Sequence, residues 1–230
     1  MIVDRPRRES AVALAAAWLA LMAGLLVGGE IDHAGSFAVA GAGGAVLVLL
    51  GFAAASRCRP LPRRSNPQRA RLAVVSLAIG TALGAANLAA NWTIAEAEPT
   101  LRALLAERIA TIDPWEAVVA SPILEEIAIR LFFMSALAWV VFRFTRRPTL
   151  AFAIGLIGSA SFFALLHLAR PFPGDPALAS YYRAALMTKY TLAGVPLGWV
   201  FWRAGLPYSI LCHAAGNAAH LALQGRVLTL

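Results

Sequence analysis

Charged residues are scarce in this chain, and their scarcity excludes a soluble fold. Only 14% of the 230 residues are charged, whereas 60% are hydrophobic and the mean hydropathy is +0.69. A soluble domain of this length cannot bury so much apolar surface, because its surface area grows too fast with mass. Apolar runs of about twenty residues recur along the chain, as in membrane-spanning helices. The sequence therefore predicts an all-α membrane protein, a polytopic bundle of about seven to eight transmembrane helices.

Cysteine and lysine are nearly absent. The two cysteines, Cys58 in a predicted loop and Cys212 in an apolar run, have neither the spacing nor the placement of a disulfide framework or a zinc motif. Lys189 is the only lysine among 20 basic residues. The Ala- and Arg-rich composition is typical of a GC-rich bacterial genome.

The net charge of +8 is concentrated in arginine clusters beside the apolar runs, at 5–8, 57–71 and 143–147. Such clusters orient a membrane protein by the positive-inside rule, so we expect no nucleic-acid partner. Basic loops alternate with non-basic ones, which predicts a cytoplasmic amino terminus and an external carboxyl terminus. The predicted location is the cell membrane, multi-pass, and specifically the bacterial inner membrane.

The apolar segments are predicted to form one integral membrane domain over residues 1–230. Residues 113–223 contain the motifs described below, and the helices within 11–93 are accessory. Between them, 94–113 is mixed in charge and is predicted to form a short interfacial helix. The segments are 11–29, 36–55, 72–93, 114–142, 149–169, 184–202 and 206–223.

Local signals support these helices. Asp113 and Pro114 have the order of an N-cap followed by a proline in the first helical turn. Glycines spaced four apart allow helix backbones to approach closely. The pairs are Gly24/Gly28, Gly80/Gly84 and Gly194/Gly198.

The stretch SPILEEIAIRLFF at 121–133 places charges inside an apolar helix, where each costs roughly 2.5–3.5 kcal/mol. Glu126 and Arg130 are four residues apart and share a helix face, so a structural salt bridge explains this pair. Glu125 lies about 100° away around the helix and lacks that partner. A leftover carboxylate in apolar surroundings can accept a proton near neutral pH, which favours a functional role. Pro122 is predicted to kink the helix and to free backbone groups nearby.

Two more patterns with helical spacing follow on separate apolar segments, Phe163-x-x-x-His167 and His213-x-x-x-Asn217. Glu125 lies eighteen residues from Arg143, at the predicted cytoplasmic end of its helix, and His167 lies eighteen residues from Thr149, at the start of the next helix. Both distances correspond to a rise of about 27 Å along the helix axis. His213 is ten residues from Arg203, a rise of about 15 Å. The depth count therefore favours His167 over His213 as the partner of Glu125. His220, one turn beyond Asn217, is predicted to border the site in a lesser role.

These residue types support two kinds of hydrolysis. A carboxylate and a histidine can bind and deprotonate a water that attacks a carbonyl, while a second histidine and an amide stabilise the oxyanion. Alternatively, one glutamate and two histidines can hold a divalent metal such as zinc, which acidifies the bound water. The residues leave both chemistries open.

The series EExxxR, FxxxH and HxxxN, each on its own apolar helix, resembles the CPBP intramembrane proteases. This group includes the type II CAAX prenyl endopeptidases and bacterial relatives linked to bacteriocin processing or self-immunity. The resemblance implies an intramembrane endopeptidase of glutamic or metallo type, acting within the bilayer on a peptide or prenylated protein substrate. It covers roughly the second half of the chain.

By position, the resemblance also implies roles. Glu125 is implied as the general base, with His167 holding or polarising the water. His213 and Asn217 are implied as the oxyanion donors. Supporting roles fall to Glu126 and Arg130. A metal, if one is bound, is implied to lie on Glu125, His167 and His213.

Other classes fit less well. The chain has no HExxH and no GxGD, and GSAS at 158–161 lacks the final glycine of GxSG. A proton-coupled transporter would also use intramembrane acids and histidines, but the polar residues cluster in one half and no inverted repeat is found. The remaining alternative is a catalytically idle scaffold or immunity protein that keeps the pocket and binds a partner.

Overall fold

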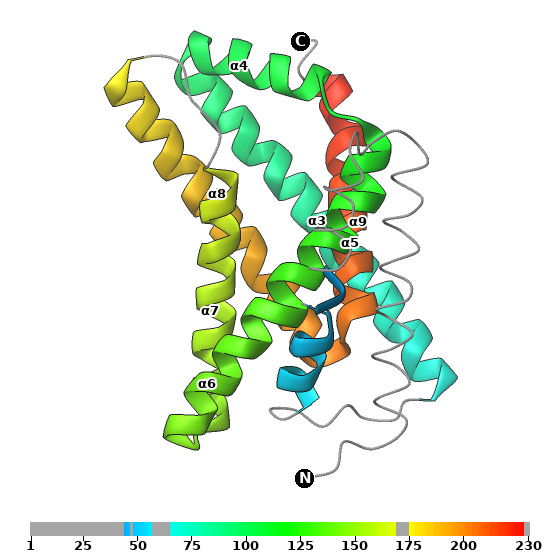
Figure 1. Cartoon of the computed structure of the whole chain (residues 1–230). Coiled ribbons are helices and arrows are strands. Elements are labelled where there is room, and N and C mark those ends of the chain that lie inside the picture. The colour runs from blue at the N-terminus through cyan, green and yellow to red at the C-terminus, as the bar shows by residue number, and fades with distance from the viewer. Residues whose placement is uncertain (1–43, 47, 57–64, 169–174, 228–230) are drawn as a thin grey trace, which may run out of the picture. The chain divides into compact units, whose positions relative to one another are not determined.

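The computed structural model describes residues 44–46, 48–56, 65–168 and 175–227 (Figure 1). Within these ranges all regular structure is helical, which confirms the all-α prediction. Three of the described helices are long and apolar enough to cross a membrane: Asn66–Ala97, Glu116–Thr145 and Pro148–His167. The predicted segment 11–29, with Gly24 and Gly28, and the loop with Cys58 lie outside the described residues.

Four predicted segments each correspond to one helix of the structure. These are α3 (Asn66–Ala97), α7 (Pro148–His167), α8 (Pro176–Ala204) and α9 (Leu206–Val227). With 29 and 22 residues, α8 and α9 are also long enough to span. However, α8 and α9 are not among the helices apolar enough to cross a membrane. Polar residues such as Lys189 in α8 and two histidines in α9 lower their hydropathy.

The predicted segment 114–142 forms one helical run that changes register along its length. Its parts are the π-helix η1 (Glu116–Ala120), α5 (Ser121–Glu125), the π-helix η2 (Glu126–Met134) and α6 (Ser135–Thr145). The start confirms the sequence signal, because Asp113 Oδ1 accepts a hydrogen bond from the Glu116 N–H at 2.7 Å. An aspartate in this place satisfies a donor that the helix leaves unpaired.

The predicted short helix in 94–113 is α4 (Pro99–Ala110). Its 12 residues rise about 18 Å, which is too short to cross a bilayer. Leu101 and Leu105 of α4 pack with Tyr182 and Leu186 of α8 in a buried apolar cluster. The cluster holds α4 against the body of its unit.

The chain divides into two compact units, residues 1–61 with 127–155, and residues 62–126 with 156–230. In the first unit, Gly51 lies against the backbone of Leu131 and Phe132, so a side chain there would collide with it. All predicted site residues except Arg130 belong to the second unit. That the whole chain forms a single membrane domain stays a prediction.

The second unit is organised by close packing of α3 on α9. A Cβ on Gly80 would collide with the Cys212 carbonyl, and a Cβ on Gly84 would collide with the Gly216 carbonyl. These contacts confirm the close approach predicted for the Gly80/Gly84 pair. They also fix the position of α9, which contributes His213 and Asn217.

Gly80→Leu is expected to lower the thermal stability of the purified protein, because its side chain would have to displace the α9 backbone. Overpacking of this kind costs about 1–3 kcal/mol. Ala82→Leu is the matched control, since Ala82 is exposed on the same helix. The melting temperature in detergent measures both variants. An equal effect of the two substitutions would contradict the close contact.

Candidate active site

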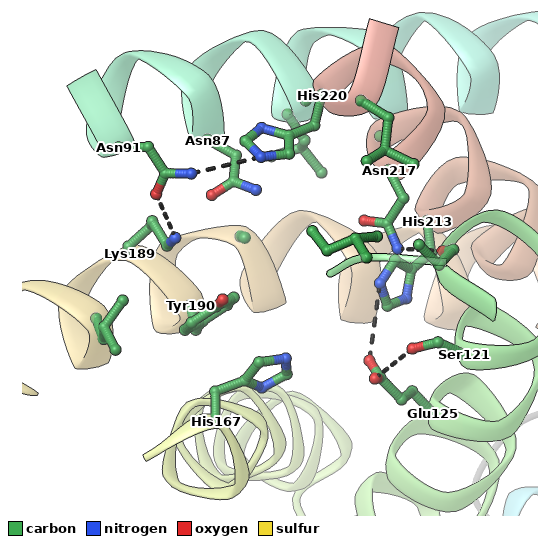
Figure 2. Close-up of a pocket in the computed structure, with 18 of the residues that line it drawn as sticks. Asn87, Asn91, Ser121, Glu125, His167, Lys189, Tyr190, His213, Asn217 and His220 are labelled. Atoms are coloured by element: carbon green, nitrogen blue, oxygen red, sulfur yellow. Dashed lines mark hydrogen bonds and ion pairs between the residues drawn. The ribbon is translucent and has the colours of Figure 1, made fainter. Parts of the chain in front are cut away.

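The second unit contains a cavity of about 250 Å³ (Figure 2). Residues from α3, α4, η1, α5, α7, α8 and α9 line it. Four of the predicted site residues face this space: Glu125, His167, His213 and Asn217. The volume is just below the range of about 300–1,000 Å³ that is usual for ligand pockets, enough for a short segment of a chain and too small for a folded partner.

Glu125 has partners, contrary to the sequence prediction of a leftover carboxylate. Its Oε1 accepts a hydrogen bond from Ser121 Oγ at 2.6 Å, and its Oε2 lies 3.8 Å from His213 Nε2. The short Ser121 bond is typical of a hydroxyl donating to a carboxylate. The Glu125 side chain remains 29% exposed, toward the cavity. Ser121 precedes Glu125 by four residues, so the spacing rule applied to Arg130 would also have found it.

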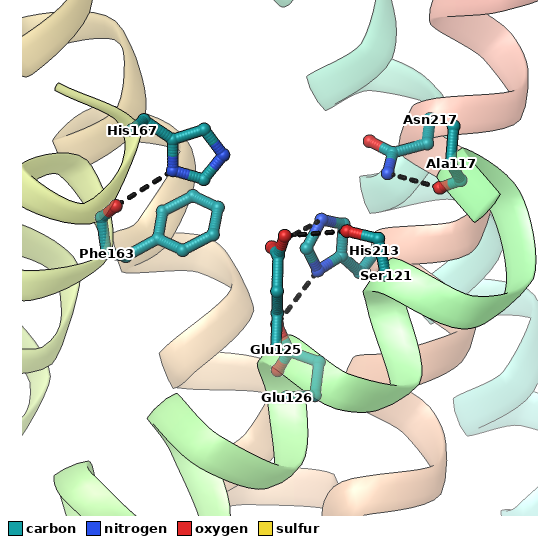
Figure 3. A network of polar contacts seen from close by, with 8 residues as sticks. All are labelled: Ala117, Ser121, Glu125, Glu126, Phe163, His167, His213 and Asn217. Carbon is teal, nitrogen blue, oxygen red and sulfur yellow. Dashed lines mark hydrogen bonds and ion pairs between the residues drawn. The ribbon is translucent and has the colours of Figure 1, made fainter. Parts of the chain in front are cut away.

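His213 lies between the two glutamates (Figure 3). Its Nδ1 is 3.0 Å from Glu126 Oε1, and its Nε2 faces Glu125. Both His213 and Glu126 are buried, at 7% and 1% exposed. Because a carboxylate accepts here, Nδ1–H donates to Glu126, and this bond fixes the ring orientation.

The depth count favoured His167 over His213 as the partner of Glu125. Within the described residues the direct contacts of Glu125 are the hydrogen bond from Ser121 and the ion pair with His213, while His167 is near enough to interact with it electrostatically. The count took each helix as perpendicular to the membrane, but tilt and rotation are set by packing against neighbours. The close contact of α9 with α3 is such a packing constraint.

His167 faces the same cavity from α7. Its Nδ1–H donates to the Phe163 carbonyl at 2.9 Å, and its ring stacks on Tyr190 with a centroid distance of 4.0 Å. Phe163 meets the rings of both His167 and His213 edge-on, at 4.5 and 5.9 Å. Since Nδ1 is the donor, Nε2 of the neutral ring is left as an acceptor toward the cavity.

Asn217 is held by a backbone group that Pro122 frees. The Ser121 N–H donates to the Glu116 carbonyl, five residues earlier, as in a π-helix. If this spacing continues, the donor to the Ala117 carbonyl is the backbone nitrogen of residue 122. Proline has no N–H to give. Instead, Asn217 Nδ2 donates to the Ala117 carbonyl at 2.7 Å. The amide keeps its second hydrogen for another acceptor.

Arg130 is fully buried and belongs to the first unit. Its predicted pairing with Glu126 and its supporting role stay predictions.

The sequence did not identify a second polar group in the cavity, formed by Lys189 and Tyr190 of α8 with Asn91 of α3. One signal was available for Lys189, because a lysine inside a predicted span marks a functional site by default. Asn91 lies on α3, which contains none of the three motifs EExxxR, FxxxH and HxxxN. His220, predicted to border the site, also lines this part of the cavity.

The predicted metal site would need Glu125, His167 and His213 to lie close enough together to bind one ion. Among the described residues, no group of three His, Cys, Asp or Glu side chains is placed to hold a metal ion. Glu125, His167 and His213 thus do not form the three-ligand set that a catalytic zinc needs.

Comparison with known proteins gives one result. Residues 108–219 match the family described as type II CAAX prenyl endopeptidase Rce1-like. The match covers just under half of the 230 residues and includes all three motifs. No curated protein and no solved structure matches the chain.

Proposed function

We propose that the chain hydrolyses a peptide bond by glutamate-activated water inside the membrane, on the basis that residues 108–219 match the Rce1-like type II CAAX prenyl endopeptidases. The family supports an intramembrane endopeptidase in general terms.

The observation that carries the proposal is His213 held between Glu126 and Glu125 at the edge of the cavity. The buried Glu126 orients the ring, and the half-buried Glu125 is open to water. This arrangement separates a supporting carboxylate from a reacting one. The two adjacent glutamates thereby have different tasks.

In the proposed reaction a water lies between Glu125 and His167. Glu125 takes one proton from it, while His167 Nε2 accepts a hydrogen bond that positions it. The water oxygen attacks the substrate carbonyl carbon, and the carbonyl oxygen becomes an oxyanion. The C–N bond then breaks, and the proton on Glu125 passes to the leaving amine.

Two donors are available for the oxyanion. As an imidazolium, His213 keeps Nδ1–H on Glu126 and directs Nε2–H toward the cavity. Asn217 offers its second amide hydrogen, because the first is held by Ala117. Donors fixed before the reaction stabilise the developing charge at no cost of reorganisation. The proposed substrate is a peptide or prenylated protein segment that reaches the site from the bilayer.

The direct test is cleavage of a peptide library, in free and prenylated form, by purified protein in detergent or liposomes. We expect discrete new termini, identified by mass spectrometry, that depend on the protein. The absence of any product across both forms would overturn the proposal.

Metal removal gives a further expected result. Cleavage should persist after dialysis against EDTA or 1,10-phenanthroline, because the donors here do not assemble a three-ligand site. A zinc-dependent peptidase treated alongside should lose its activity. Loss of cleavage that added zinc restores would contradict the glutamic mechanism and support the metal alternative.

A further inference from the structure

Among the described residues, three side-chain amides line the cavity, and the protein itself holds two of them. Asn217 Nδ2 donates to the Ala117 carbonyl at 2.7 Å. Asn91 Oδ1 accepts a hydrogen bond from Lys189 Nζ at 2.8 Å. The third amide belongs to Asn87 of α3, about one turn before Asn91 on the same helix.

Asn87 differs from the other two amides in its bonding. Its side chain is half-buried, and its amide is directed into the cavity (Figure 2). The Oδ1 atom is buried and receives no hydrogen bond from any residue that the structure describes. A buried acceptor without a donor is destabilising, whereas an apolar side chain in its place carries no such cost. The amide of Asn87 is therefore available to a ligand of the cavity.

The walls of the cavity limit how a peptide can be bound there. A peptide within the membrane must pair its own N–H and C=O groups, because bulk water does not reach them. Many peptide-binding proteins meet this need with the free edge of a β-sheet. Every described wall element is instead a helix, whose backbone groups are paired along the helix itself. Even the Ala117 carbonyl, which Pro122 leaves without a backbone donor, is taken by Asn217. Side chains must then supply the hydrogen bonds to a bound peptide.

We propose that the side-chain amide of Asn87 binds the main chain of the substrate at one residue. Oδ1 accepts the N–H of that residue and Nδ2 donates to its C=O, since these two groups point to the same side of an extended chain. A carboxamide thus takes the place of a residue in a neighbouring antiparallel strand. A carboxylate has no hydrogen to donate and an ammonium has no acceptor, so neither could form both bonds.

This subsite rests on the proposed peptidase function and adds a substrate-binding role for α3, which lies outside the family match at 108–219. Asn87 and Glu125 line the same cavity of about 250 Å³. The residue held by Asn87 is therefore close to the bond that is cleaved. Recognition of the main chain fixes the path of the substrate without selecting its side chains.

Asn87→Leu has two expected effects. The KM of the best-cleaved peptide of the library should rise about 5- to 50-fold, the loss of two hydrogen bonds between neutral groups. The melting temperature should stay the same or rise, because the variant removes a buried acceptor that lacks a donor. Asn87→Ala repeats the test with a side chain too small to block the cavity. Thr81→Leu is the matched control with unchanged KM, since Thr81 is exposed on the same helix and does not line the cavity.

Binding of ester analogues to Glu125→Gln protein tests the subsite without turnover. The probe is a fluorescent form of the best-cleaved peptide or, if none is cleaved, of the library peptide that binds most tightly. Each main-chain N–H of the probe is replaced in turn by an ester oxygen, which removes one donor. One ester should bind about 3- to 10-fold more weakly than the others, as expected for one hydrogen bond. Adding Asn87→Leu should remove this difference.

The outcomes separate the subsite from the peptidase function. Equal binding of all esters, or a sensitive position that persists after Asn87→Leu, overturns the subsite and leaves the peptidase proposal standing. An unchanged KM in Asn87→Leu with a lower melting temperature also overturns it and assigns Asn87 a structural role. A preference for asparagine or glutamine side chains in the peptide, lost in Asn87→Leu while all esters bind equally, overturns it in favour of side-chain recognition. An Asn87-dependent ester pattern without cleavage of any peptide supports the subsite and overturns the peptidase proposal.

Discussion

Glu125→Gln is expected to reduce kcat by about 10²–10⁴-fold, the contribution of a positioned general base. Glutamine has nearly the size of glutamate and can still accept the Ser121 hydrogen bond through its carbonyl oxygen. It cannot take a proton from water. The measurement is the rate of product formation on the best peptide from the library, at saturating substrate.

The control for this variant is Glu116→Gln. Glu116 belongs to the same helical run, is exposed and does not line the cavity. It should keep wild-type turnover and stability. Wild-type cleavage by Glu125→Gln would remove Glu125 from the reaction, while a lower melting temperature of that variant alone would assign it a structural role.

His213→Gln is expected to lower kcat by about 10²–10³-fold, because it removes the ring that faces Glu125 and that we propose as a donor to the oxyanion. Glu126→Gln should cost about 10- to 100-fold, since an outer partner acts by orienting the group in front of it. The double variant should be no slower than His213→Gln alone. Residues that act as a unit give strongly non-additive losses.

The comparison of the three variants distinguishes orientation from folding. If Glu126 serves only to hold His213, substituting Glu126 should not lower kcat further in a variant that already lacks His213. Losses that multiply in the double variant would mean that Glu126 acts independently of His213. Melting temperatures measured in parallel show whether the buried Glu126 also contributes to stability, as loss of one member of a buried charged pair can do.

The helices could be predicted from the sequence because each is specified locally. An apolar run of sufficient length, a proline in a first turn and an aspartate cap need no knowledge of the rest of the chain. The spacing of Gly80 and Gly84 also predicted a close contact between helices, but it did not predict which helix is the partner. The partner, α9, follows only from the tertiary structure.

The site was predicted less completely, because spacing within one helix is local and pairing between helices is not. Four of the predicted site residues line one cavity. The direct contact of Glu125 with His213 was not expected, since residue counts along two helices contain no information on their tilt or rotation. Lys189 and Asn91 are 98 residues apart, and no pattern in either helix relates them. Such a pair becomes visible only when packing brings α3 and α8 together.

The hydrogen bond from Asn217 to the Ala117 carbonyl restricts the routes by which a peptide can enter the cavity. Moving α9 away from residue 117 would leave a bare carbonyl in apolar surroundings, at a cost of about 1–3 kcal/mol, and would break the glycine contacts with α3 as well. Parting of these helices is therefore an unfavourable route of entry. The substrate is expected to arrive along another wall of the cavity, while α9 stays docked through the catalytic cycle.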